Sequence, residues 1–397
     1  MSTPRPVLRR RKAASVIAAA LLAVCSVAVT STPDPPALSQ DRTPLVKPGP
    51  FARAGECAGC HQVIHDGWSE SAHARAATTP GFTAAIAGLR DAPEALEGCA
   101  ACHAPTVRAT HDLGLEMPIT REGVTCDFCH TVAEMRPGSG GVEFVLDPGP
   151  LKRGPFLYTE SPWHGTGFSP LFKSGPLLCA GCHEHVNASG VAILTTWSEW
   201  KESDWPGQGV SCQDCHMPLA PGATAERATG GPSRRLVNGH RIVGGTSRSW
   251  VHHGIDLSID ALRLDGATLE AVVSVNNAGA GHRVPGGLPG RRLVLEVGFE
   301  TAAVAFRPVE ERTWQRVLLD AQGQPLDDAG AIFLRAAREG TDTRLRPGEV
   351  RSERFRLVPP PGSRALVARL EYRDASNPSI PQRIALITEV RRNLPPP

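Results

Sequence analysis

The most restrictive feature of this 397-residue chain is a five-residue pattern that occurs five times. In each copy two residues separate a pair of cysteines, and a histidine follows the second cysteine at once. These copies use ten of the eleven cysteines, and the eleventh, Cys25, lies near the N-terminus. Any fold must therefore satisfy five local constraints, centred on Cys57–His61, Cys99–His103, Cys126–His130, Cys179–His183 and Cys212–His216.

The pattern Cys-x-x-Cys-His is the attachment signature of haem c. Two thiols three positions apart lie on one face of a helical turn, where they can form thioethers to one edge of a porphyrin. The next residue then lies beneath the iron as its proximal ligand. The predicted thioether residues are Cys57, Cys60, Cys99, Cys102, Cys126, Cys129, Cys179, Cys182, Cys212 and Cys215. The predicted proximal ligands are His61, His103, His130, His183 and His216.

Disulfides, zinc and thiol redox chemistry are the competing interpretations of a single Cys-x-x-Cys pair. With 14 histidines in the chain, five such pairs would each be followed by histidine by chance only about once in 10⁷. A zinc ribbon also needs no histidine at that position. We therefore predict five haem c groups, and none at Cys25, which has no partner cysteine and no following histidine.

Nine further histidines could supply the sixth ligands. Methionine is a weak rival, because only Met117, Met135 and Met217 lie beyond the initiator, and Met217 directly follows a proximal histidine. Mostly bis-histidine, low-spin irons of comparatively low potential are therefore expected. Surface or core histidines are the alternative for each candidate. The candidate distal ligands are His73, His111, His164, His240 and His282, whereas His65 and His185 lie too close to attached haems to reach another iron easily.

The N-terminus has the pattern of an export signal. A basic stretch, Arg9–Lys12, precedes an apolar run from Ala13 to Val29, and small residues suit cleavage after Ala28. An uncleaved membrane anchor and lipidation at Cys25 are the alternatives. Haem c attachment follows export, so the sequence predicts residues 1–28 as a signal peptide and the periplasm as the location.

The composition excludes some classes of protein and favours others. A formal net charge of +2 gives no case for nucleic-acid binding. The chain has 40 Gly and 36 Pro but only 5% aromatic residues, which is a poor basis for a hydrophobic core. Large apolar cofactors would compensate for that deficit.

The chain also resembles a known family, the multihaem cytochromes of the cytochrome c-554 (cytochrome c-552/4) group. The first haem motif followed by Trp68 and Ser71–Ala76 is similar to that family's first haem segment, and Glu122–His130 to its closely spaced middle haem. Trp197–Trp200 leading into Gln208–Pro218 is a further similarity. The resemblance covers roughly residues 51–253.

This resemblance implies a mostly helical, loop-rich domain with haems in closely packed pairs, and it implies that His73 and His164 are distal ligands. The chain departs from the family in having five motifs rather than four. It lacks the Cys-x-x-Cys-Lys motif of pentahaem nitrite reductases, and neither Tyr158 nor Tyr372 marks a tyrosine-crosslinked haem. The two absences count against a pentahaem nitrite reductase and against an enzyme with a tyrosine-crosslinked haem.

From about Ile255 cysteine disappears and apolar residues alternate with polar ones, as in strands of a β-sandwich. The prediction is an α+β chain with a multihaem domain at 51–220, a linker at 221–254 and a β-sandwich of about seven strands at 255–397. The strand-like runs are 269–275, 293–299, Trp314–Leu319, Arg354–Val358, Ala365–Tyr372 and Ile384–Val390.

Two histidine-bearing segments accompany the second domain. His282 lies in a glycine-rich loop, Asn276–Gly287, and His240 precedes Arg241–Gly245. Both segments resemble elements of the C-terminal part of related multihaem cytochromes, which implies that both histidines reach haems of the first domain. Glycines in the loop would let the backbone approach a porphyrin without Cβ clashes.

These observations favour an exported pentahaem electron carrier. Its expected partners are redox proteins, such as a membrane quinol-linked or outer-membrane cytochrome complex. The alternative is a haem enzyme that reduces or oxidises a small nitrogen or sulfur compound at one open iron. A third possibility is an assembly module that docks through its β-sandwich. No separate acid–base constellation is visible, so the sequence identifies no catalytic residue.

Overall fold

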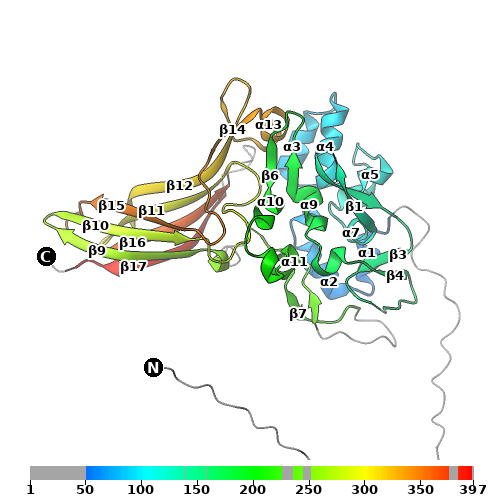
Figure 1. Ribbon diagram of the computed structural model, residues 1–397, viewed down its shortest axis with the longest axis horizontal. Coiled ribbons are helices and arrows are strands. Elements are labelled where there is room, and N and C mark those ends of the chain that lie inside the picture. The colour runs from blue at the N-terminus through cyan, green and yellow to red at the C-terminus, as the bar shows by residue number, and fades with distance from the viewer. Residues whose placement is uncertain are drawn as a thin grey trace, which may run out of the picture. The chain divides into compact units, whose positions relative to one another are not determined.

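The computed structural model describes residues 51–138, 140–157, 159–225, 236–244, 252–374 and 383–395 (Figure 1). The predicted signal peptide and much of the predicted linker lie outside these ranges. All described residues belong to one compact unit that starts at Thr43. Within them, no helix is both long and apolar enough to cross a lipid bilayer.

The part of the chain before residue 254 is built from short helices, the longest being the 11-residue α4. Isolated helices of this length are marginal in water, so tertiary contacts must stabilise them. Proline at the first helical position starts α3, α4 and α6. The helices are α1 (Ala54–Ala58), α2 (Gln62–Ser69), η1 (His73–Arg75), α3 (Pro80–Ala87), α4 (Pro93–His103), α5 (Val107–Thr110), α6 (Pro118–Arg121), α7 (Cys126–His130), α8 (Leu171–Ser174), α9 (Leu177–His183), α10 (Thr196–Lys201), η2 (Pro206–Gln208) and α11 (Cys212–His216).

Two-stranded ribbons lie between these helices, and the expectation of a mostly helical, loop-rich domain did not include them. Phe144 of the first ribbon contacts Phe128 edge-on at 5.0 Å. It also lies where a Cβ on Gly181 would be, so only glycine fits inside the fourth motif at that position. The ribbons thereby position the motif helices. They are β1 (Val132–Gly138) with β2 (Gly141–Leu146), β3 (Leu151–Gly154) with β4 (Gly165–Phe168), β5 (Glu184–Val186) with β6 (Ala192–Thr195), and β7 (Leu219–Pro221) with β8 (Leu236–Asn238).

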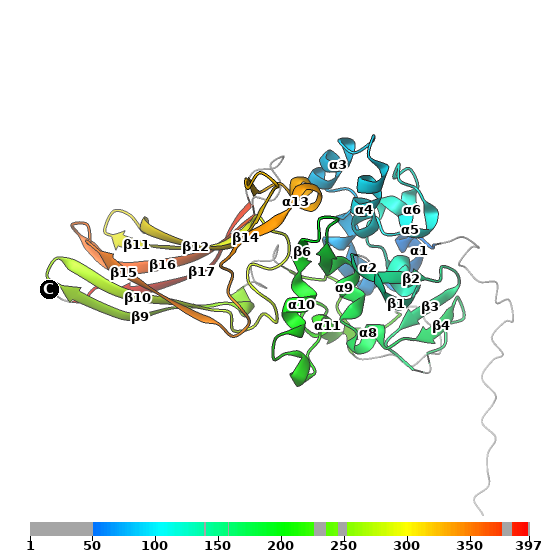
Figure 2. The same ribbon diagram turned by 45° about the horizontal axis from the view of Figure 1, so that its top comes forward.

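The C-terminal part consists of two antiparallel sheets that share one core (Figures 1 and 2). One sheet has the order β15-β10-β9, and the other has β13-β12-β11-β16-β17 with β14 beside β12. The elements are β9 (Asp256–Asp265), β10 (Thr268–Asn276), β11 (Arg291–Thr301), β12 (Arg307–Leu319), β13 (Pro325–Leu326), α13 (Ala329–Arg335), β14 (Arg338–Asp342), β15 (Val350–Leu357), β16 (Ser363–Asp374) and β17 (Arg383–Asn393).

The predicted alternation of apolar residues is confirmed in this core. Leu269, Val273 and Val275 of β10 are fully buried, and so are Leu293 and Phe299 of β11. β9 was not predicted, because its apolar positions step from Ile259 to Leu262 instead of keeping a period of two. A register shift in its pairing with β10 absorbs the extra residue, as a β-bulge does. The structure is thus α+β, with an all-β part after a helical part.

The helical and β parts are joined by a shared apolar cluster. Ile193 of β6, Leu318 of β12 and Ile332 of α13 are fully buried in it. Arg316, which is 5% exposed, donates to the carbonyl oxygens of Ala192 at 2.7 Å and Ile193 at 3.1 Å. The hydrogen bonds of this buried guanidinium hold β6 against β12.

Candidate functional site

A single cavity of about 2010 Å³ runs through the helical part and is closed in part by residues of the β part. Pockets for one small ligand usually have about 300–1,000 Å³. All ten motif cysteines and all five motif histidines line it. The five motifs therefore face one continuous space.

Four of the five motifs end in a helix, and in the first motif α1 ends at Ala58, before Cys60 and His61. α7 and α11 consist of the third and fifth motifs, and α4 and α9 end on the histidines of the second and fourth. In each case the histidine follows the last cysteine within the same turn. This local geometry is the one that thioether attachment and proximal ligation need.

Thiols of different motifs lie within hydrogen-bonding reach of one another. Cys57 contacts Cys126, which links the first motif to the third. Two further contacts link the second motif to the fourth and the fourth to the fifth, through Cys102–Cys182 and Cys179–Cys212. Each attachment site is therefore adjacent to another one. Burial also raises the pKa of the Cys129 thiol to about 12, as expected in apolar surroundings.

Seven histidines around the cavity donate a hydrogen bond from Nδ1 to a backbone carbonyl, over 2.5–3.0 Å. This bond selects the tautomer and orients the ring, and it leaves Nε2 available as a metal ligand. Four of them are motif histidines and three are predicted distal ligands. They are His61, His103, His130, His216, His164, His240 and His282, with acceptors on Thr224, Ala76, Arg153, Val243, Gly165, Asn238 and Arg283.

Three motif histidines face a second histidine at nearly the same distance. The ring centroids are 6.3 Å apart for His61 and His164, 6.2 Å for His73 and His183, and 6.3 Å for His216 and His282. Imidazole nitrogens bind transition metals at about 2.0–2.1 Å, and the ring centre lies about 1 Å behind the nitrogen, so two ligands on opposite sides of one metal have centroids about 6 Å apart. Each pair is therefore spaced for one iron between the two rings.

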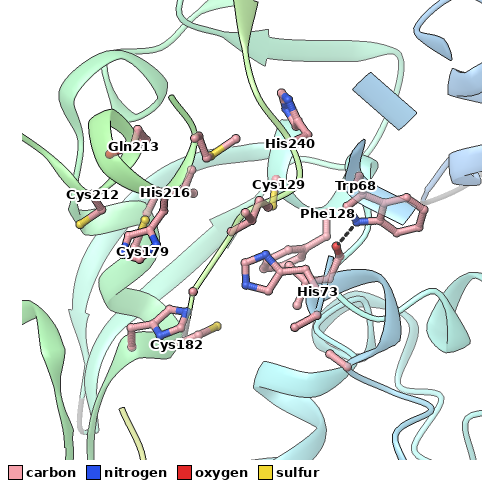
Figure 3. Close-up of a pocket in the computed structure, with 18 of the residues that line it drawn as sticks. Trp68, His73, Phe128, Cys129, Cys179, Cys182, Cys212, Gln213, His216 and His240 are labelled. Atoms are coloured by element: carbon pink, nitrogen blue, oxygen red, sulfur yellow. Dashed lines mark hydrogen bonds between the residues drawn. The ribbon is translucent and has the colours of Figure 1, made fainter. Parts of the chain in front are cut away.

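The His130 ring stacks on Phe172, with centroids 5.0 Å apart and planes at 11°, and His130 acts electrostatically on His240. Burial, followed by the proximity of His130, lowers the pKa of His240 to about 4. Burial likewise lowers the pKa of His73 to about 4 and of His183 to about 3. These imidazoles are neutral, which is the state that binds a metal. Figure 3 shows His73, His216 and His240 around the space that Cys129, Cys179, Cys182 and Cys212 also border.

His103 has a different neighbour. Its ring stacks on Phe82 of α3, with centroids 4.5 Å apart and planes at 8°. A phenyl ring cannot ligate iron, so this contact orients His103 without supplying a sixth ligand. The sequence did not single out Phe82, because a phenylalanine in an amphipathic helix predicts only core packing.

Four of the five candidate distal histidines line the cavity: His73, His164, His240 and His282. His111 is not among the lining residues and is exposed at the end of α5, where it has a φ of 57°. Its left-handed conformation ends the helix and directs the chain onward. The structure therefore gives His111 no place in the candidate site. His65, His185 and His253 also line the cavity.

The lining residues fit the carboxylate groups of haem as well as its apolar face. Trp197 Nε1, Thr159 Oγ1 and Thr224 Oγ1 are buried beside the cavity and have no hydrogen-bond partner among the described protein atoms. Buried donors of this kind normally have a hydrogen-bond partner, so a bound group that accepts hydrogen bonds would supply the missing partners. Four cationic side chains also line the cavity: Lys152, Arg153, Arg291 and Arg335.

The loop that carries His282 approaches the site as the glycines suggest. A Cβ on Gly281 would lie 3.1 Å from Trp200 Cδ1. A Cβ on Gly286 would lie 2.7 Å from His282 Cε1, closer than real Cβ contacts allow. The loop therefore needs glycine at 286 for the imidazole to keep its position.

Comparisons with known proteins agree with this geometry. Residues 56–131 match the family model described as cytochrome c554 and c-prime. A penta-heme cytochrome c552 from Thermochromatium tepidum has a similar structure, with a TM-score of 0.67 and 22% identity over 87% of this chain and 99% of that one. At this identity the likeness shows the fold. No curated protein matches the sequence.

Two other structural matches carry no argument. A β-glucosidase from Kluyveromyces marxianus has a TM-score of 0.16 and 9% identity, over 35% of this chain and 14% of that one. The structural genomics target SoR45 also has a TM-score of 0.16, with 11% identity over 36% of this chain and 88% of that one.

Proposed function

Because the chain is a multihaem c-type cytochrome, we propose that it transfers electrons between redox proteins through five closely spaced haem c groups. When bound, haem c supplies a one-electron couple at its iron. The observation that carries the proposal is the adjacency of the motifs around one cavity, with thiol contacts from the first to the third, the second to the fourth and the fourth to the fifth. Adjacent attachment sites are what a chain of electron-transfer steps requires.

Four irons would have two histidine ligands each. We assign the pairs His61–His164, His183–His73 and His216–His282 from their spacing, and His130–His240 from their proximity. Bis-histidine ligation without methionine favours comparatively low potentials. The protein's part is to hold each imidazole through its Nδ1 bond and to keep water away from the irons.

A second function is favoured by one observation. The His103 ring stacks on Phe82, and among the described residues no histidine makes a ring contact with it or shifts its pKa. An iron on His103 with an open sixth position could bind a small nitrogen or sulfur compound and exchange electrons with it. In this alternative the other four irons carry electrons to or from the iron on His103.

Haem content and spin state test both functions. After maturation in a host that attaches haem c, the mass of the purified protein is expected to show five haem additions. Electron paramagnetic resonance is expected to show at least four low-spin irons, because four motif histidines have histidine neighbours. The ferrous protein is then exposed to carbon monoxide.

The spin state of the iron on His103, and whether it binds carbon monoxide, decide between the two functions. A high-spin signal together with carbon monoxide binding, both lost when Cys99 and Cys102 are replaced by alanine and the second haem is no longer attached, would establish the open site of the alternative. Five low-spin irons would exclude that alternative. Fewer than five additions would mean that at least one motif is unused, and two or more high-spin irons would contradict the four proposed bis-histidine pairs.

We also propose that the protein acts in the periplasm, because haem c is attached after export and residues 9–29 have the pattern of a signal. Fractionation of a Gram-negative host is expected to recover the haem-containing protein from the periplasm, with a mature N-terminus after Ala28. Stable full-length apoprotein in the cytoplasm would contradict this. The proposed partners are redox proteins, such as a membrane quinol-linked or outer-membrane cytochrome complex.

A further inference from the structure

A buried ion pair joins the helical part to the β part beside the loop that carries His282. Glu199 of α10 and Arg344, which follows β14, have side chains only 7% and 4% exposed. Arg344 Nη2 lies 2.6 Å from Glu199 Oε1. Removing two charges from water costs several kcal/mol per ion, so such a pair is retained only where its partners are well arranged.

The carboxylate of Glu199 accepts hydrogen bonds on both oxygens. Oε1 accepts from Arg344 and also from Thr195 Oγ1 at 2.6 Å. Oε2 accepts from the backbone N–H of Arg283 at 3.0 Å. Arg283 follows His282 directly, so Glu199 holds the peptide group that joins these two residues.

The same peptide group is held from its other side. Asn277 is fully buried and donates from Nδ2 to the carbonyl oxygen of His282 at 2.9 Å. The His282 imidazole donates from Nδ1 to the carbonyl oxygen of Arg283 at 2.9 Å. The direction of His282 Nε2 therefore depends on the backbone at residue 283, which Glu199 fixes.

The surrounding charges are balanced. Asp342 accepts from Arg344 Nε at 2.9 Å and from its Nη2 at 2.8 Å. Arg283 Nη1 lies 3.6 Å from Asp342 Oδ2. Two carboxylates thus face two guanidinium groups, and a neutral residue at 199 would leave a buried positive charge beside the loop.

We propose that Glu199 is a positioning residue that holds His282 as the distal ligand of the iron on His216. Glu199 does not touch the iron. It belongs to the helical part and holds the backbone of the β part, so it sets where the ligand from the second part enters the first. The proposal rests on the proposed ligation by His282, whose ring lies 6.3 Å from that of His216.

The test uses the haem-loaded Glu199→Gln variant, which keeps the shape of the side chain. An amide has one acceptor oxygen and one donor group, so it cannot accept from Arg344, Thr195 and the Arg283 N–H together. Loss of a residue that orients a metal ligand typically weakens the ligand's hold about 10–100-fold. We expect the fraction of one ferrous iron that binds carbon monoxide to rise by a similar factor, with unchanged haem content.

Two reference variants are measured under the same conditions. Glu202→Gln removes the charge of an exposed residue at the end of the same helix and is expected to match the wild type. His282→Ala shows complete loss of the ligand. If His282→Ala opens one iron to carbon monoxide and Glu199→Gln does not, the positioning role is overturned and ligation by His282 stands. If His282→Ala changes nothing, the ligation itself is overturned.

If Glu199→Gln does not yield haem-loaded protein, a milder variant can be used in its place. Thr195→Val removes one hydrogen bond to the Glu199 carboxylate and leaves every charge in place. It is then expected to raise the carbon monoxide-binding fraction of one iron, by less than His282→Ala. An unchanged fraction in Thr195→Val would overturn the proposal.

Discussion

Replacement of His282 by alanine should convert one low-spin iron to a high-spin form and open it to carbon monoxide. The imidazole of His282 is parallel to that of His216 within 11°, with ring centroids 6.3 Å apart. Alanine has no group that could bind iron across that gap. Electron paramagnetic resonance and the carbon monoxide spectrum of the ferrous protein measure the change, which we expect to be one iron per molecule and essentially complete.

A matched control is His111→Ala, because His111 is exposed and does not line the cavity. It should leave every spin state unchanged. Gly286→Ala is a second route to the same effect, since its Cβ would lie 2.7 Å from His282 Cε1 and must displace the ring. If His282→Ala retains all its low-spin irons, the β part must be explained as a docking module.

Without haem, the helical part should fail to fold while the β part keeps its structure. The main buried cluster of the helical part holds only six residues, Ala77, Phe82, Ala100, Ala104, Val107 and Leu115, whereas the same part surrounds a space of about 2010 Å³. Without haem the apolar lining of that space faces water, and each Å² of apolar surface left exposed loses about 25 cal/mol of stabilisation. Whole domains are stable by only about 5–15 kcal/mol.

The β part has a core of its own. Nineteen buried residues form its cluster, including Leu269, Leu293, Phe299 and Leu370. We therefore expect the chain made without haem attachment to yield, on limited proteolysis, a fragment that begins near residue 255 and has the circular dichroism of a β protein. The haem-loaded protein should resist the same protease over most of its length.

Protection of the region before residue 255 in the haem-free chain would show that the helices need no cofactor. Complete digestion would show that the β part depends on its contacts with the helical part. The shared cluster of Ile193, Leu318 and Ile332 is the contact whose loss would then be responsible. Differential scanning calorimetry of the haem-free chain separates these outcomes, because only an independent β part gives a cooperative transition.

The sequence alone determined the features that depend on local spacing. Cysteines three residues apart with an adjacent histidine predict each attachment site without knowledge of the fold, because the three residues lie close together along the chain. Alternation in 269–275 and 293–299 identified buried strands for the same reason, since a strand's two faces follow a period of two. The glycines beside His282 predicted a close approach of the backbone to a porphyrin, and in the structure Gly286 leaves room for the imidazole of His282 itself.

Tertiary structure decided which residues meet across the chain. His61 and His164 are 103 residues apart, and their pairing depends on how the ribbons return the chain to the cavity. The sequence included His111 among the candidate ligands, and the structure leaves it exposed at the end of α5, away from the cavity. Glu199 and Arg344 are 145 residues apart. A carboxylate between Trp197 and Trp200 has no local signal that names its partner, so only the packing of the two parts identified Arg344.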